Sequence, residues 1–397
     1  MSTEKSVSYV ATTFYGLEQV LSEELLNLKA EDIALHNRAV SFKGNKSLLY
    51  EANLKLRTAL RILQPIASFV VTDQQSLYNG AKAINWENLM NAEQRIYIHS
   101  ISNHPAFNNT MFVSQKVKDA IADYFREHSG IRPSIDKFDP DIQIQVHINK
   151  NKCTISLDSS GIPLYKRGYR QDTGEAPINE VLAAGIVLLS KWDSDKTLVD
   201  PMCGSGTVLI EAAMYALNIA PGKFRKFFAF QRWKDYDEAL FNKIKDEAIE
   251  SEKKKKLRII GCDQSQKVLF AAIENLEACG LDDIIELNKK EMYEFTPPEG
   301  GGWLVSNPPY GERMGLTERI EMLYKTIGDT LKKKYSGYEA WIISSNLEAL
   351  KKVGLSASRK ITLYNGPLEC KLMRYELYDG TKKKHKTERK RQNSDNR

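Results

Sequence analysis

Two glycines follow an aspartate at the end of a short apolar segment within Thr197 to Pro221 of the 397-residue chain. Asp200 closes the expected strand, Gly204 and Gly206 form a tight turn, and an apolar helix follows. Such a turn is where α/β sheets build nucleotide sites, because glycines let the backbone approach a ligand that a Cβ would exclude. The spacing D-x-x-x-G-x-G is neither the dinucleotide fingerprint nor a phosphate loop. Alone, it is equally compatible with an ordinary helix start.

A second candidate site lies where an apolar strand beginning at Trp303 runs into Asn307, Pro308, Pro309 and Tyr310. Prolines fix φ and remove backbone donors, so the carbonyl groups and the asparagine side chain are held beside an aromatic ring. A rigid pair of acceptors next to a stacking surface suits a flat base with an exocyclic amine. N-P-P-Y alone is compatible with a plain strand-to-loop turn. After D-x-x-x-G-x-G, we favour a binding site.

The two motifs together resemble motifs I and IV of class I S-adenosylmethionine-dependent methyltransferases that act on amino nitrogens of bases. Further segments resemble the THUMP-domain RNA methyltransferases, in particular the bacterial 23S rRNA guanine-N2 methyltransferase family. They are Y-K-R-G-Y-R at 165–170, A-P-I-N-E-V-L-A-A at 176–184, N-I-A-P-G at 218–222 and F-A-F-Q-R-W at 228–233. The resemblance covers nearly the whole chain except its tail. Some members carry a second methyltransferase domain, and we expect a single one here.

The resemblance implies S-adenosylmethionine as the cofactor, bound at the carboxyl ends of neighbouring strands, and no metal. Asp263, which ends the second strand, would accept hydrogen bonds from ribose hydroxyls. Glu291 stands where the family often has an aspartate that contacts the adenine amine. The implied cofactor-binding residues are Asp200, Pro201, Cys203, Gly204, Gly206, Thr207, Asp263, Glu291 and Asn307. The implied catalytic residues are Asn307, Pro308 and Tyr310.

The implied reaction transfers a methyl group from the cofactor sulfonium to the exocyclic N2 amine of a guanine in 23S rRNA. The lone pair of that amine is conjugated into the ring, so acceptors for its N–H groups would reorient it and offset the developing charge. The Asn307 side-chain oxygen and the Pro308 carbonyl are the expected acceptors, and Tyr310 would stack on the base. No strong general base is needed. The base must leave its stack, which costs least in single-stranded loops.

Other functions stay open at this point. N-P-P-Y also occurs in adenine-N6 methyltransferases, and a related group of THUMP enzymes methylates guanine N2 in tRNA. An alternative of another class is a non-catalytic RNA-binding factor in ribosome assembly. The presence of all the expected cofactor and substrate residues counts against it, because a chain released from catalysis need not retain Asp200, Gly204, Gly206, Asp263 and Asn307.

We expect the elements that position these residues to form an α/β fold, the seven-stranded Rossmann-like sheet of class I methyltransferases. An α+β N-terminal half precedes this sheet in the chain. The pattern from Val7 to Val71 reads β-α-β-α-β and predicts a ferredoxin-like module. Strict alternation from Ile142 to Ile148 predicts a strand with a hairpin partner at Lys152 to Leu157. The expected domains are a ferredoxin-like module (1–70), a THUMP RNA-binding domain (71–160), a class I methyltransferase domain (161–380) and a basic, disordered tail (381–397).

The net charge of +6 resides entirely in the tail, which holds eight Lys or Arg and two Asp or Glu, while the rest of the chain is formally neutral. The tail either adds non-specific phosphate affinity or only keeps the chain soluble. Five scattered cysteines without C-x-x-C argue against a disulfide framework or a zinc site and suit a reducing cytosol. No stretch reads as a signal peptide or membrane span. We therefore expect a cytoplasmic protein with RNA as partner and no obligate protein partner.

Overall fold

The computed structural model describes residues 6–170, 177–310 and 317–379, so the expected tail at 381–397 lies outside the described residues. The chain forms two units. The first comprises Met1–Thr13, Leu21–Lys166 and Arg225–Glu250, and the second comprises Phe14–Val20, Arg167–Phe224 and Ser251–Arg397. A cut near residue 160 would therefore separate Arg225–Glu250 from the residues it packs against.

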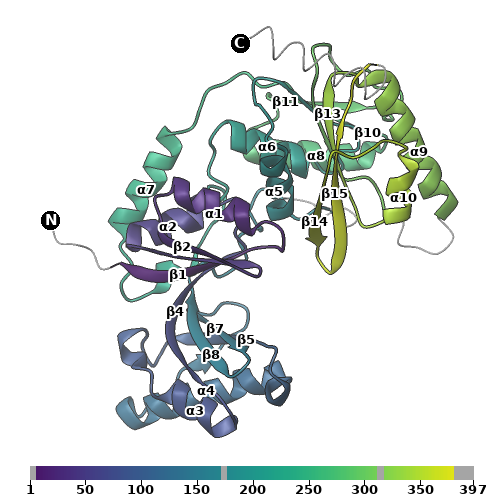
Figure 1. The fold of residues 1–397 in the computed structure, drawn as a ribbon. Coiled ribbons are helices and arrows are strands. Elements are labelled where there is room, and N and C mark those ends of the chain that lie inside the picture. The colour runs from purple at the N-terminus through teal and green to yellow at the C-terminus, as the bar shows by residue number, and fades with distance from the viewer. Residues whose placement is uncertain (1–5, 171–176, 311–316, 380–397) are drawn as a thin grey trace, which may run out of the picture. The chain divides into compact units, whose positions relative to one another are not determined.

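The first unit begins with a ferredoxin-like β-α-β-β-α-β arrangement, which confirms the expected class of module (Figure 1). Its elements are β1 (Val7–Thr12), α1 (Glu18–Asn27), β2 (Glu31–His36), β3 (Ala39–Gly44), α2 (Lys46–Lys55) and β4 (Arg61–Val70). The sequence analysis missed β2. This edge strand is exposed at nearly every residue, and its register shifts between Glu31 and Ala34, so it carries no alternating pattern.

Glu24 lies on the apolar face of α1, where a charge is unexpected. Its carboxylate accepts hydrogen bonds from the backbone amides of Arg57 at 2.8 Å and Thr58 at 3.0 Å, and the Thr58 hydroxyl is a third donor. Burial raises the pKa of Glu24, and these hydrogen bonds partly oppose that shift. The acid thus satisfies the backbone of the turn that leads into β4.

The THUMP region continues the same sheet. Its elements are α3 (Gln74–Lys82), β5 (Arg95–Ser102), α4 (Thr110–Ser129), β6 (Ser134–Ile135), β7 (Ile142–Asn149) and β8 (Lys152–Asp158). The eight strands run in the order β2-β3-β1-β4-β8-β7-β5-β6, so β4 joins the two halves. All four apolar residues of β7 are buried, as the alternation predicted, and β7 pairs with β8 through a turn between Asn149 and Lys152.

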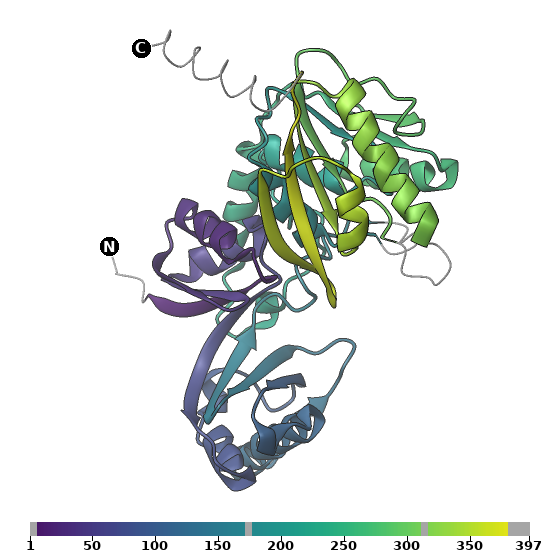
Figure 2. The same ribbon diagram turned by 45° about the vertical axis from the view of Figure 1, so that its right-hand side comes forward.

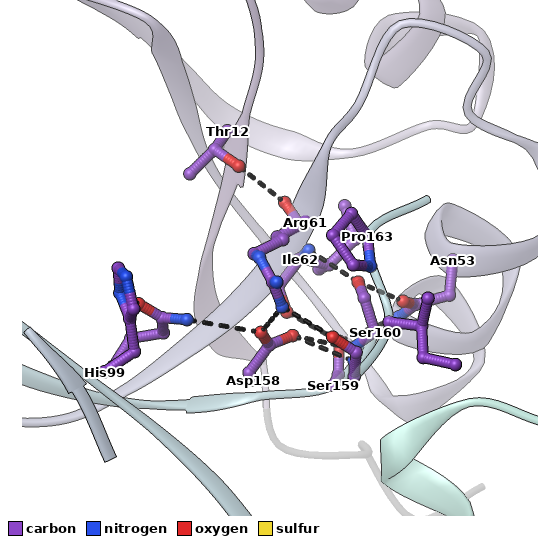
Figure 3. Close-up of polar contacts among 12 residues, drawn as sticks. Thr12, Asn53, Arg61, Ile62, His99, Asp158, Ser159, Ser160 and Pro163 are labelled. Carbon is purple, nitrogen blue, oxygen red and sulfur yellow. Dashed lines mark hydrogen bonds and ion pairs between the residues drawn. The ribbon is translucent and has the colours of Figure 1, made fainter. Parts of the chain in front are cut away.

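A buried polar network holds the end of β8 against the start of β4 (Figure 3). Asp158 is fully buried, forms an ion pair with Arg61, and accepts hydrogen bonds from the amides of Ser160 at 2.9 Å and Gly161 at 3.1 Å. The Ser160 hydroxyl donates to Asn53 on α2 at 2.7 Å. The segment that leaves the THUMP sheet is therefore tied to the ferredoxin-like module.

The segment 218–256, which follows the first motif, contains the helix α7 (Glu238–Glu250). Aromatic rings of this segment pack in the first unit. Phe230 stacks on Tyr50 of α2 with ring centroids 4.4 Å apart, and Phe241 meets the same ring edge-on at 5.6 Å. Aromatic contacts of this kind add to the area that the rings bury. Residues 225–250 thus belong to the packing of the ferredoxin-like module.

The second unit contains the seven-stranded sheet that was expected, in the order β11-β10-β9-β12-β13-β15-β14. Its strands are β9 (Thr197–Asp200), β10 (Ile259–Asp263), β11 (Ile285–Lys289), β12 (Gly302–Ser306), β13 (Tyr338–Ser344), β14 (Arg359–Asn365) and β15 (Leu368–Glu376). The first five strands of that order are parallel, and β15 runs antiparallel to both neighbours. Asn365 pairs with Leu368, so Gly366 and Pro367 form the turn that closes the last hairpin.

Helices cover both faces of this sheet (Figures 1 and 2). They are α5 (Glu180–Ser190), α6 (Thr207–Ala216), α8 (Gln266–Cys279), α9 (Thr317–Lys334) and α10 (Leu347–Lys352). Helix α9 buries Tyr324, Ile327 and Leu331 against strand residues that include Leu304 and Ile342. The short helix α10, which the sequence analysis did not predict, packs beside α9. Among the described residues, no helix has both the length and the apolar character needed to cross a membrane.

The close approach of α9 and α10 depends on Gly328. A Cβ at this position would lie 1.9 Å from the backbone carbonyl oxygen of Val353, at the end of α10.

We expect Gly328→Ala to lower the free energy of unfolding by roughly 1–3 kcal/mol, because the two helices must separate to make room for the methyl group. This loss exceeds the gain of about 1 kcal/mol that alanine gives over glycine within a helix. Urea denaturation measures the change. The control Lys325→Ala, exposed on the same helix, should stay near wild type, and equal stability of both variants would contradict this packing.

Candidate active site

Three parallel strands of the second unit end side by side in polar residues. Asp200 ends β9, Asp263 ends β10, and Asn307 directly follows β12. Strand β9 pairs with both β10 and β12, so β9 is the central strand of the three. Carboxyl ends of parallel strands form one edge of a sheet, and ligands of open α/β sheets bind there. The structure thus brings together the residues of the two sequence motifs.

The glycine turn is held by the acid of the neighbouring strand. Gly204 has φ +55° and Gly206 has φ +79°, a left-handed conformation that favours glycine. The Gly204 amide donates a hydrogen bond to Asp263 Oδ2 at 3.1 Å. A Cβ on Gly204 would meet no atom within 4 Å among the described residues, so the backbone faces open space. A ligand can therefore approach this turn closely.

Asp263 keeps capacity for a further partner. Its Oδ1 accepts the amide of Ser265 at 2.9 Å, which starts α8, while Oδ2 accepts that of Gly204. An ionised carboxylate offers about four lone-pair sites, and this side chain is partly exposed. Hydroxyl donors of a ligand can therefore still bind to it.

Asp200 is buried, with 1% of its surface exposed. Burial raises its pKa from the ordinary value of 3.8 to about 7, the nearby Asp263 carboxylate adds to the rise, and the Met202 amide, which donates to Asp200 at 3.2 Å, opposes it. A cation placed beside Asp200 would favour its ionised form. The end of β9 is therefore an electrostatically suitable position for a positively charged ligand.

The remaining residues of the first motif are buried around this turn. Pro201 and Thr207 are buried, and the Cys203 amide donates to the Cys262 carbonyl at 2.9 Å. Burial raises the pKa of the Cys203 thiol well above its usual range, and neighbouring carboxylates add to the rise. Cys203 therefore stays a thiol and contributes packing to the turn, not a nucleophile.

The basic and aromatic segment at 165–170 reaches the start of α6. Arg170 Nη2 donates to the Thr207 hydroxyl at 3.1 Å, and its Nε donates to Glu180 on α5 at 2.8 Å. Arg167 and Glu211 form an ion pair at 3.2 Å in which both side chains are almost fully buried. Sequence reasoning missed this pair because the two residues lie on separate segments with no common spacing. The pair anchors the segment to α6.

Glu291 lies beyond the end of β11, on the far side of β10 from Asp200. It is exposed, and its backbone amide donates to the side chain of Glu294 at 3.2 Å. Its contact with a cofactor adenine stays a prediction.

The N-P-P-Y segment has an internal hydrogen bond that the sequence did not predict. The Tyr310 hydroxyl donates to the side-chain oxygen of Asn307. Burial raises the pKa of Tyr310, so this hydroxyl remains a donor. Pro308 is buried and Asn307 is partly exposed. One lone pair of the amide oxygen is thus occupied by Tyr310, and the other stays available for a substrate N–H.

Comparison with known proteins agrees with this arrangement. A family model described as an RMKL-like methyltransferase domain matches residues 167–374. The chain belongs to this methyltransferase family. A THUMP domain matches residues 71–158, and an RlmL ferredoxin-like domain matches residues 8–63. The family and its solved relatives establish S-adenosylmethionine as the cofactor, and the open space before Gly204 fits such a ligand.

Individual relatives cover the chain almost completely. A Synechocystis protein, named as a candidate RNA methyltransferase, is 38% identical over 93% of this chain and 97% of its own length. The ribosomal RNA large subunit methyltransferase K/L of Methylococcus capsulatus is 38% identical over 93% of this chain. This chain spans about half of the K/L relative, 51% of its length.

Solved structures show the same fold. SMU.472, a candidate methyltransferase complexed with SAH, is 33% identical with a TM-score of 0.86, covering 96% of this chain and 100% of its own. A possible methylase from Clostridium difficile is 31% identical with a TM-score of 0.87, covering 95% of this chain and 100% of its own.

The raised pKa of Asp200 predicts a pH-dependent stability. Between about pH 4 and pH 7 the folded protein keeps a proton that the unfolded chain releases, so this group contributes less stability as pH rises to about 7 and then levels off. We expect Asp200→Asn, which cannot titrate, to become more stable relative to wild type over this range, by up to about 1.4 kcal/mol per pH unit. Urea denaturation of the cofactor-free proteins tests this. A stability difference that does not change with pH would contradict it.

Proposed function

We propose that this protein transfers a methyl group from S-adenosylmethionine to the N2 amine of a guanine in 23S rRNA. The observation that carries the proposal is the position of Asn307, at the end of β12 and beside the glycine turn that follows β9. In this proposal, the amide and carbonyl acceptors of the N-P-P-Y segment lie next to the bound cofactor. The THUMP region and the name of the K/L relatives support a ribosomal RNA substrate.

We further propose a division of labour along the chain. Residues 1–70 form the ferredoxin-like module, 71–160 the THUMP domain that binds RNA, 161–380 the catalytic domain and 381–397 a basic tail. The Arg225–Glu250 segment of the catalytic stretch packs in the first unit. We also propose that the protein acts on its rRNA substrate in the cytoplasm and needs no obligate protein partner.

Cofactor binding is assigned to the strand ends of the second unit. Gly204 and Gly206 let the cofactor approach the backbone, Asp263 accepts ribose hydroxyls with its free lone pairs, and Glu291 is assigned to the adenine amine. Asp200 provides a negative charge for the cationic part of the ligand. Pro201, Cys203 and Thr207 shape the turn. The bound cofactor supplies an electrophilic methyl group on a sulfonium.

Catalysis is assigned to the N-P-P-Y segment. The free lone pair of the Asn307 amide oxygen and the Pro308 carbonyl accept the two N–H groups of the substrate amine, which turns its lone pair toward the methyl group and offsets the charge that develops on nitrogen. The Tyr310 hydroxyl, by donating to Asn307, fixes the orientation of that amide. The Tyr310 ring is assigned to stacking on the base.

An adenine-N6 activity is the second candidate. A solved structure from Listeria monocytogenes, named as a predicted N6-adenine-specific DNA methylase, is 30% identical with a TM-score of 0.85, covering 94% of this chain and 97% of its own. Because acceptors for an exocyclic amine can bind either adenine or guanine, only the methylated product distinguishes the two activities.

The test incubates purified protein with labelled cofactor and undermethylated 23S rRNA or tRNA, followed by nucleoside mass spectrometry. The proposal predicts N2-methylguanosine in 23S rRNA. N6-methyladenosine, tRNA methylation alone, or no product from a cofactor-bound protein would contradict it.

The cofactor assignment predicts the effect of a side chain at Gly204. We expect Gly204→Val to fold and to lose cofactor affinity at least tenfold, because the side chain would enter the space that the ligand needs. Gly280→Val is a matched control, since Gly280 also has a left-handed φ of +64° with no atom near its Cβ and lies at the end of α8. Calorimetry measures binding. Equal affinity of the two variants would show that the pocket is misplaced.

The catalytic assignment predicts graded effects of three substitutions. Asn307→Ala should lower the single-turnover rate by roughly 10²–10³, by analogy with a lost oxyanion donor. Tyr310→Phe keeps the ring, removes the hydroxyl that donates to Asn307, and should cost about tenfold or less. Tyr310→Ala should also weaken RNA binding by roughly 1–3 kcal/mol through lost stacking.

The three variants are compared at saturating cofactor, with cofactor affinity as the control. That affinity should change little, because these groups face the base more than the sulfonium. Near-normal turnover by Asn307→Ala would refute the mechanism. If Tyr310→Ala and Tyr310→Phe bound RNA with equal affinity, the proposed stacking of the Tyr310 ring on the base would be contradicted.

A further inference from the structure

Asn346 contacts two elements with the two ends of one side-chain amide. It precedes α10, and its Oδ1 accepts the backbone amide of Ala349 at 2.9 Å, which caps the helix. Its Nδ2 donates to the backbone carbonyl of Tyr310 at 3.1 Å. The start of α10 and the end of the N-P-P-Y segment are therefore joined through one residue.

The backbone contact of Asn346 with β13 and its cap of α10 together determine the orientation of its side-chain amide. Its backbone amide donates to the Ser344 hydroxyl at 3.0 Å, at the end of β13. The Ser344 hydroxyl also contacts the Tyr324 hydroxyl of α9 at 2.7 Å, in the buried interior. A flipped amide would set an NH₂ group against the Ala349 amide, so the cap selects the orientation that directs the donor at Tyr310.

The N-P-P-Y segment needs such an external tie. Pro308 and Pro309 have no N–H groups, so half of the residues in this stretch cannot donate a backbone hydrogen bond that would hold it. Tyr310 is also the residue whose hydroxyl binds the Asn307 amide oxygen. Fixing the Tyr310 carbonyl therefore fixes the backbone that carries this hydroxyl and, through it, the orientation of Asn307.

We infer that Asn346 is a positioning residue for methyl transfer, which holds the Tyr310 carbonyl so that the acceptors for the substrate amine stay in register with the cofactor. The inference rests on the proposed function. A purely structural role is separable from it, because Ser caps a helix about as well as Asn but carries no donor long enough to reach Tyr310.

The test compares Asn346→Ser with a matched cap elsewhere. Asn45 caps α2 by accepting the Leu48 amide at 3.0 Å, so Asn45→Ser is the control. We expect both variants to keep the wild-type melting temperature and cofactor affinity. Asn346→Ser alone should lose about 10- to 100-fold in single-turnover rate, the scale of a misplaced reacting group.

Two further readouts separate positioning from general damage. On an Asn307→Ala background, Asn346→Ser should add little further loss, because it acts through the same acceptors. Hydrogen–deuterium exchange of the peptide that carries Asn307 and Tyr310 should rise in Asn346→Ser and not in Asn45→Ser.

Wild-type rate and exchange in a folded Asn346→Ser would overturn the inference, as would a loss that multiplies fully with that of Asn307→Ala. A wild-type protein that methylates no guanine would instead count against the proposed function alone. The exchange measurement would then still decide whether Asn346 holds the segment, with unchanged exchange overturning the inference.

Discussion

The hydrogen bond from the Gly204 amide to Asp263 is the contact on which the site depends. It joins the turn after β9 to the end of β10, and it requires both the parallel pairing of these strands and the left-handed conformation of Gly204. With the turn held in this way, the glycine backbone faces open space, and α6 begins directly behind it. A change that lost this bond would move the turn and the first residues of α6 together.

Two carboxylates lie close together beside this contact. Asp200 and Asp263 end adjacent strands, and Asp200 is buried where its pKa rises to about 7. In the free protein, that burial makes the ionised form costly. A cationic ligand reverses the balance, so the site suits a sulfonium better than a neutral or anionic compound. In the proposed function, the acids serve the binding of the methyl donor, and the neutral acceptors Asn307 and Pro308 bind the substrate amine.

The sequence predicted what local pattern or a motif encodes. The alternation of β7, the turn at Gly204 and the strand before Asn307 were all recognisable, and the family resemblance supplied the seven-stranded sheet. The sequence pattern did not predict β2, because this edge strand has no alternation of buried and exposed residues, and it did not predict α7. The buried pair of Arg167 with Glu211 and the Asn346 contact with Tyr310 join residues 44 and 36 positions apart. Such contacts follow from tertiary packing, so no spacing of residues in the sequence predicts them.

The most direct test of the central claim is nucleoside mapping of 23S rRNA from a strain that lacks this protein. The account predicts that one N2-methylguanosine is missing, that the wild-type chain restores it, and that Asn307→Ala restores it poorly although the variant is folded and binds cofactor. A complete set of N2-methylguanosines in the deletion strain, or full restoration by Asn307→Ala, would contradict the account.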